Sequence, residues 1–110
     1  EFLYGKWNIK ALDTCSGEGI WDSILRDKGV FYFHKDLTCD VKYTGREPFL
    51  FGKTFYWTRK SEDIFEMYNY LYIFPSIIKV VNNNEIEMYM TQKNVQYVSY
   101  HVILKRKLKQ

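Results

Sequence analysis

The sequence predicts an all-β domain in which about eight antiparallel strands follow one another in chain order and close into an up-and-down (meander) barrel. Short segments of alternating apolar and polar residues recur along the chain, and turn-forming residues separate them. Aromatic residues make up 19% of the chain, with ten Tyr and eight Phe. Such side chains favour strands because they pack well across a pleated surface. A short helical turn is predicted only near residues 20–27.

Length and composition predict one folded domain over residues 1–110, because a chain of this size can bury a single core. The net charge of +3 is small and scattered, which argues against a nucleic-acid partner. No apolar segment reaches the roughly 18 residues of a membrane span, so no transmembrane segment is expected. The chain begins at Glu1, and a lipid anchor or secretion signal upstream of it stays open as an expectation.

The first predicted strand covers residues 3–11, where apolar residues on one face alternate with cationic and polar residues on the other. Residues 13–29 break this alternation. They begin with turn residues, and four apolar residues then recur at helical spacing: Ile20, Trp21, Ile24 and Leu25. This spacing predicts one or two helical turns near residues 20–27.

The rest of the chain predicts three β-hairpins, which pair residues 30–34 with 37–43, 54–59 with 64–68, and 77–81 with 85–90. Residues 44–53 are predicted to form a longer loop that carries the apolar run Phe49-Leu50-Phe51. An extended segment ends at Pro75, which predicts an edge, bulge or bend because proline cannot donate to a sheet. The last predicted strand covers residues 95–108.

Trp7 on the first predicted strand and Arg106 on the last are predicted to meet, because closure of the sheet makes these strands neighbours. An indole attracts a guanidinium by about 0.5–2 kcal/mol, and by more where water is excluded. We expect the pair to act as a structural plug at one end of the barrel.

With these features the chain resembles the lipocalin-like members of the calycin group, in particular the short bacterial forms. Gly5-Lys6-Trp7 fits the family's Gly-x-Trp on the first strand, Arg106 fits its basic residue on the last, and residues 77–88 resemble its penultimate strands. The resemblance implies a barrel with one open end and a periplasmic or cell-surface location. The chain differs from larger lipocalins because it is shorter and shows no long C-terminal helix.

The first functional hypothesis is a non-catalytic module that binds a small hydrophobic or amphipathic ligand in the barrel mouth. We expect Trp21 and Phe51 at the rim. The ligand-binding side chains expected inside are Tyr32, Tyr43, Trp57, Met88 and Tyr100, together with Ile9, Val41 and Val102. The alternative is a protein-binding domain with a filled interior, such as an inhibitor or an immunity-type protein. Its contacts would come from outward aromatic residues, namely Tyr68, Tyr70, Tyr72 and Tyr97.

No catalytic or metal site is predicted. His34 and His101 lack the short paired spacings of metal ligands, and the combination of Ser99, His101 and Asp40 lacks a nucleophile elbow. We therefore expect no enzyme activity, no cofactor and no metal.

Two states are open for Cys15 and Cys39. A disulfide between them would close a loop of about 25 residues and contribute about 3 kcal/mol to stability. Two free thiols are the other state.

Overall fold

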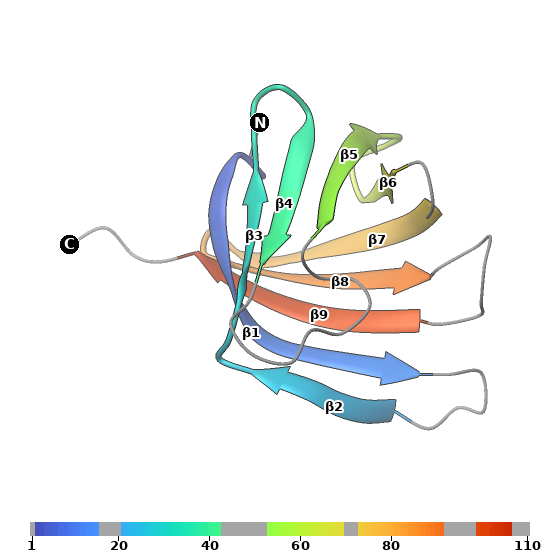
Figure 1. The fold of residues 1–110 in the computed structure, drawn as a ribbon. Helices are drawn as coiled ribbons and strands as arrows, with labels where there is room; N and C mark the ends of the chain where they lie inside the picture. Colours follow the sequence, from blue (N-terminus) through green and yellow to red (C-terminus); the bar gives the residue numbers. More distant parts are fainter. Residues whose placement is uncertain (1, 16–20, 43–52, 70–72, 92–98, 107–110) are drawn as a thin grey trace.

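The computed structural model describes residues 2–15, 21–42, 53–69, 73–91 and 99–106, and the statements below refer to these residues (Figure 1). They form strands and no helix. The strands are β1 (Gly5–Cys15), β2 (Trp21–Arg26), β3 (Val30–Phe33), β4 (Thr38–Lys42), β5 (Lys53–Arg59), β6 (Ile64–Tyr68), β7 (Ile73–Asn82), β8 (Glu85–Thr91) and β9 (Ser99–Arg106).

The strands form one closed antiparallel barrel. Their order is β2-β1-β3-β4-β5-β6-β7-β8-β9, and an additional pairing of β1 with β9 closes the sheet. One edge of β1 pairs with β9, whereas the other edge is divided between β3, opposite residues 5–8, and β2, opposite residues 11–15. Because β2 and β3 share one position, the nine strands occupy eight positions. The predicted eight-stranded up-and-down barrel is confirmed.

The predicted helical turn near residues 20–27 is wrong, because Trp21–Arg26 forms β2. A bulge explains the misleading pattern. Leu12 pairs with Leu25 and Asp13 pairs with Ser23, so Ile24 is an extra residue that shifts the alternation of β2. The strand forms because β1 is longer than β3, and β2 supplies backbone partners for the remaining edge of β1.

The chain passes from β2 to β3 through a tight turn with two positive φ angles, 56° at Asp27 and 92° at Gly29. Two backbone hydrogen bonds hold this turn against β1. The Asp27 N–H donates to the Lys10 carbonyl, and the Ile9 N–H donates to the Gly29 carbonyl, both at 2.9 Å.

Pro75 lies inside β7, so the two segments predicted around it form one strand. It pairs with Glu66 of β6, and the pairing of β7 with β8 begins one residue later, at Ser76. This proline therefore precedes the part of β7 that has partners on both sides. The predicted strand residues 43, 71–72, 95–98 and 107–108 and the apolar run at 49–51 lie outside the described residues.

Aromatic rings cross the barrel interior in two groups. Phe33 contacts Trp57 and Phe65, with ring centroids 5.6 and 6.4 Å apart. Phe74 contacts Phe55 at 5.7 Å and Tyr100 at 6.0 Å. Such edge-to-face pairs add about 0.5–1.5 kcal/mol each to the gain from burial. In the described part of the chain, these rings and the aliphatic residues around them form one buried cluster.

Gly5, at the start of β1, has a φ of +115°, a conformation that side chains disfavour. A Cβ atom added there would meet no other atom within 4 Å, so only the backbone resists substitution. Gly5→Ala is expected to lower the free energy of unfolding by about 1 kcal/mol, measured by urea denaturation. The control is the exposed Lys6→Ala, which should change stability by less than about 0.5 kcal/mol. Equal stability of both variants would contradict this account.

Candidate functional site

The sequence-predicted ligand residues separate into two groups. The first group is buried: Trp57, Met88 and Tyr100, together with Ile9, Val41 and Val102. Four of these residues come from strands β5, β8 and β9, whereas Ile9 lies on β1 and Val41 on β4. The Trp57 indole N–H donates to the Thr38 carbonyl of β4 at 3.2 Å, which fixes this ring against the barrel wall. These residues are members of the packed core cluster. Tyr43 and Phe51 lie outside the described residues.

Tyr32 and Trp21 do not face the interior. Tyr32 is 44% exposed, because Phe31 and Phe33 on either side of it are the buried residues of β3. The expectation that Tyr32 points inward is therefore wrong. Trp21 is 47% exposed and packs edge-on against His101, with ring centroids 6.4 Å apart. His101 itself lies on the outer face, between the buried Tyr100 and Val102.

One end of the barrel is closed by Trp7, Arg106 and the segment that precedes β1. The carbon atom of the Arg106 guanidinium lies 4.2 Å from the ring centroid of the fully buried Trp7 and 5.0 Å from that of Phe2. The Trp7 indole N–H donates to the Leu3 carbonyl at 3.0 Å, and Arg106 Nη2 donates to the Phe2 carbonyl. The Leu3 side chain is buried beneath them. Sequence analysis predicted the Trp–Arg contact but not the part played by residues 2–3.

Both cysteines are free and buried. The two cysteines lie at opposite ends of β1. Cys15 is its last residue, whereas Cys39 lies level with its first residue, because Cys39 pairs with Phe33 and Phe33 pairs with Gly5. The length of β1, 11 residues, separates the two thiols by about 30 Å along the barrel, well beyond the ~7 Å that a disulfide allows between Cα atoms. Of the two states open from the sequence, the structure has free thiols. Burial raises the pKa of the Cys39 thiol, and the nearby Asp40 raises it further.

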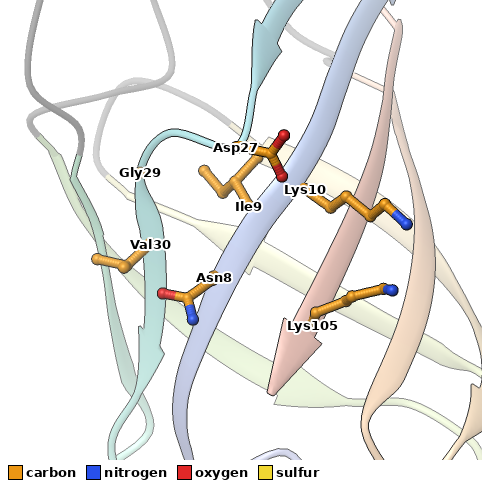
Figure 2. Close-up of a pocket in the computed structure, with 7 residues that line it drawn as sticks. All are labelled: Asn8, Ile9, Lys10, Asp27, Gly29, Val30 and Lys105. Carbon is orange, nitrogen blue, oxygen red and sulfur yellow. The ribbon is translucent and has the colours of Figure 1, made fainter. Parts of the chain in front are cut away.

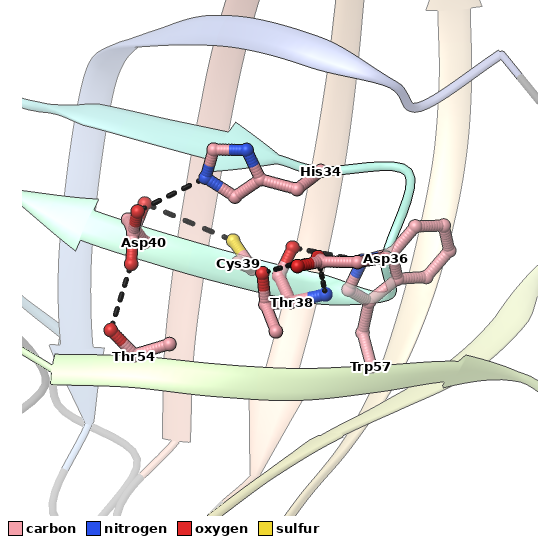
Figure 3. Close-up of polar contacts among 7 residues, drawn as sticks. All are labelled: His34, Asp36, Thr38, Cys39, Asp40, Thr54 and Trp57. Atoms are coloured by element: carbon pink, nitrogen blue, oxygen red, sulfur yellow. Dashed lines mark hydrogen bonds and ion pairs between the residues drawn. The ribbon is translucent and has the colours of Figure 1, made fainter.

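A polar cluster lies on the outer face of the β3–β4 hairpin (Figure 3). His34 Nε2 and Asp40 Oδ2 are 3.0 Å apart, and the Thr54 hydroxyl donates to Asp40 Oδ1 at 2.8 Å. The His34 ring stacks on Tyr32, with centroids 4.2 Å apart. Asp40 is thus engaged by His34 rather than by His101. The Thr54 and His34 hydrogen bonds hold the pKa of Asp40 below its ordinary value of 3.8.

The lowered pKa of Asp40 predicts an acid-sensitive contribution to stability. Its carboxylate contributes fully above pH 3.8, and the contribution is lost as the pH falls through the lower pKa of the folded state. Asp40→Asn is expected to lower stability at neutral pH and to flatten the decrease in stability below about pH 4. Urea denaturation at pH 2.5–6 measures both effects. Parallel pH profiles of wild type and variant would contradict the assignment.

Described residues line two of the clefts on the outer surface. The larger of these two, about 470 Å³, lies beside β1 at the β2–β3 turn and is lined by Asn8, Ile9, Lys10, Asp27, Gly29, Val30 and Lys105 (Figure 2). The neighbouring Lys105 side chain lowers the pKa of Lys10, because two ammonium groups close together repel each other. Lys105 also pairs with Glu85 at 3.3 Å. The carboxylates of Asp27 and Glu85 lie near the two lysines, so the cleft carries charges of both signs.

The smaller cleft, about 380 Å³, lies beside the polar cluster and is lined by Tyr4, Gly5, Tyr32, Phe33, His34 and Lys35. No group of three or more His, Cys, Asp or Glu side chains suited to a metal ion occurs among the described residues.

Four exposed apolar or aromatic side chains and one half-buried histidine form a row on the outer face. We call this row the outer stripe: Ile64, Ile77, Tyr89, His101 and Trp21. Ile64 pairs with Ile77, Ile77 with Tyr89, and Tyr89 with His101, so these residues are direct cross-strand neighbours on β6 to β9. Opposed side chains of this kind lie about 5 Å apart at Cβ. Ile64, Ile77 and Tyr89 are 44%, 54% and 46% exposed.

His101 is held in a defined position within the outer stripe. Its ring stacks on Tyr89, with centroids 4.6 Å apart and planes inclined by 26°. Its Nε2 lies 3.4 Å from Glu87 Oε2, and its Nδ1 lies 3.8 Å from Asp13 Oδ2. Asp13 also pairs with Arg26 at 2.9 Å. Carboxylates on both sides of the ring therefore orient it, and the three rings of Tyr89, His101 and Trp21 form a continuous aromatic surface.

Sequence analysis missed the outer stripe. Of the tyrosines it proposed as outer contacts, Tyr68 stacks on Tyr56 at 5.8 Å, elsewhere on the barrel surface, and Tyr70, Tyr72 and Tyr97 lie outside the described residues. The sequence carries part of the signal, because Ile77, Tyr89 and His101 each lie between two buried residues. The pairing register was needed to show that they lie side by side.

Comparisons with known proteins identify no family for this chain. No protein-family model matches it, and no curated protein sequence matches it. Among solved structures it is similar to a redesigned β-barrel, with 16% sequence identity over 97% of this chain and 93% of that one and a TM-score of 0.47. No helix in the described part of the chain is long and apolar enough to cross a membrane.

Proposed function

We propose that this barrel is a non-catalytic protein-binding domain with a filled interior, and that the outer stripe is its contact surface. The observation that carries the proposal is that the exposed Ile77 and Tyr89 are cross-strand neighbours and that His101 joins them to the exposed Trp21. Soluble monomers rarely expose contiguous apolar surface without a binding role. Trp and Tyr are also the residue types that contribute most to protein interfaces.

The packed core supports this function over ligand carriage. Trp57, Met88 and Tyr100 were the predicted inner ligand contacts, but each is buried within the core cluster. A ligand would have to displace these side chains from one another. We further propose that the barrel is of the lipocalin-like type, which the contact between Trp7 and Arg106 supports. An inhibitor or immunity-type protein of this kind would use its outer wall rather than its interior.

A titration separates the two functions. Trp fluorescence is followed while oleate, or an environment-sensitive dye, is added to the whole protein. In a Trp21→Phe background, which removes the exposed indole, a filled barrel is expected to give no saturable change, because Trp7 and Trp57 are already buried by protein. Saturable quenching that is lost in a variant with an altered interior, such as Met88→Trp, would contradict the filled interior and support the carrier.

Site-specific cross-linking tests the contact surface. A photoreactive phenylalanine analogue replaces Tyr89 in the outer stripe or, as a matched control, Tyr32, an equally exposed tyrosine outside it. We expect a specific cross-linked protein from position 89 only, identified by mass spectrometry. With that protein purified, Tyr89→Ala should weaken binding about 30-fold, the effect of a strong interface contact, and Tyr32→Ala should leave binding unchanged. Equal effects of the two alanine variants would contradict the proposal.

A further inference from the structure

His101 lies within the outer stripe and has a carboxylate beside each of its two ring nitrogens. Its Nε2 lies 3.4 Å from Glu87 Oε2 on β8, and its Nδ1 lies 3.8 Å from Asp13 Oδ2 on β1. The three side chains are only 21%, 25% and 22% exposed, so water screens their charges in part. On β2, Arg26 continues this line of charges, because it pairs with Asp13 at 2.9 Å.

This arrangement distinguishes the two protonation states of the imidazole ring. A neutral imidazole has one N–H donor, whereas the imidazolium has two. Carboxylate oxygens accept hydrogen bonds and cannot donate them, so the neutral ring can satisfy either Glu87 or Asp13 but turns a lone pair towards the other. The imidazolium donates to Glu87 and attracts Asp13 at the same time. Histidine side chains ordinarily change between these states at about pH 5–8.

We propose that His101 makes the outer stripe a pH-dependent contact surface, which binds the protein partner more tightly when the imidazole ring is protonated. The inference rests on the proposed function and specifies how that site is regulated. Protonation holds the ring between the two carboxylates, in the orientation in which it stacks on Tyr89 and meets Trp21. Loss of the proton removes one of the two attractions. The ring is then free to turn, and the aromatic surface loses its middle member.

The charge balance favours the same direction. Glu87, His101, Asp13 and Arg26 form one chain of contacts. With His101 protonated, two positive and two negative charges cancel, whereas a neutral His101 leaves one negative charge uncompensated. Lys79 of β7 stands opposite Glu87 but is exposed, so water screens its charge. A partner that covers the outer stripe removes the chain of contacts from water, where an unpaired carboxylate is costly. We therefore expect binding to weaken as the pH rises through neutrality.

The ring can be tested first in the free protein, by NMR of histidine labelled with ¹⁵N. At about pH 5.5 we expect both ring N–H protons of His101 to be visible, with contacts to the Tyr89 ring, and at about pH 8 one N–H proton at most and weaker contacts. His34 is the matched control, because it also stacks on a tyrosine and contacts a carboxylate but lies outside the outer stripe. An unchanged position of the His101 ring at both pH values would overturn the inference.

Binding is measured with the protein that is cross-linked through position 89, once it is purified. We expect its affinity to be about tenfold higher at about pH 5.5 than at about pH 8, the effect of one hydrogen bond to a charged group. His101→Gln should remove this dependence, and His34→Gln should leave it. Glu87→Gln should also abolish the preference for acidic pH, because the chain of contacts is then neutral with the unprotonated ring.

Failure of this inference can be distinguished from failure of the proposed function. Equal affinity at both pH values, or the same pH dependence in wild type and His101→Gln, would overturn the regulation and leave the outer stripe as a contact surface. A pH dependence that both histidine variants retain would belong to the partner and would likewise overturn it. If position 89 gave no specific cross-linked protein, the proposed function would fail, and the regulation would fail with it even where NMR shows that the His101 ring moves.

Discussion

Phe74→Ala is expected to lower the free energy of unfolding by about 3–5 kcal/mol, the range for removal of a buried aromatic ring from a packed core. The Phe74 side chain is fully buried, and its ring bridges Phe55 and Tyr100 across the interior. Its loss removes apolar burial and two ring contacts and leaves a cavity that the barrel wall can fill only in part. Urea denaturation monitored by circular dichroism measures the change.

Two controls make this result informative about function. Tyr89→Ala removes an aromatic residue from the exposed outer stripe and should change stability by less than about 1 kcal/mol. Benzene should bind Phe74→Ala and restore part of its stability, because an apolar cavity of this origin stays dry and accepts small apolar molecules. A hollow barrel predicts the opposite: a small loss for Phe74→Ala, and wild-type protein that is stabilised by benzene as much as the variant.

The barrel and its closure could be predicted from the sequence because they depend on local alternation. Trp7 and Arg106 each lie in a clear alternating segment, and closure of a meander makes the first and last strands neighbours. Strand β2 could not be predicted in this way. Its bulge at Ile24 gives the apolar residues a helical spacing, and the segment forms a strand because the long β1 needs backbone partners.

The candidate site was less predictable than the fold. Val30–Phe33 is apolar in both phases, so the alternation could not decide whether Tyr32 or its neighbours face inward, and the core contains Phe31 and Phe33. The outer stripe is harder still to predict, because residues such as Ile64, Ile77 and Tyr89 come from different strands. A shift of one residue in any pairing would move a stripe residue to the other face. Only the complete register brings these side chains together.

The closed end of the barrel gives the second large expected effect. Arg106→Ala should lower the free energy of unfolding by about 2 kcal/mol, because it removes a partly desolvated cation–π contact and a charge-assisted hydrogen bond. The contact is with Trp7, and the hydrogen bond is with the carbonyl of Phe2. Since the same guanidinium holds the segment that precedes β1, hydrogen exchange of residues 3–7 should accelerate as well.

Arg106→Lys is the matched control, because it keeps the positive charge but loses the planar group that lies over the indole. We expect it to retain part of the lost stability, about 1 kcal/mol, and to leave the exchange of residues 3–7 faster than in wild type. If both variants were as stable as wild type, Arg106 would be a surface residue and the closure of this end would depend on Leu3 and Trp7 alone. If both variants lost the same amount of stability, the effect would come from the planar guanidinium, which both variants lack. It would not come from the positive charge, which Arg106→Lys keeps.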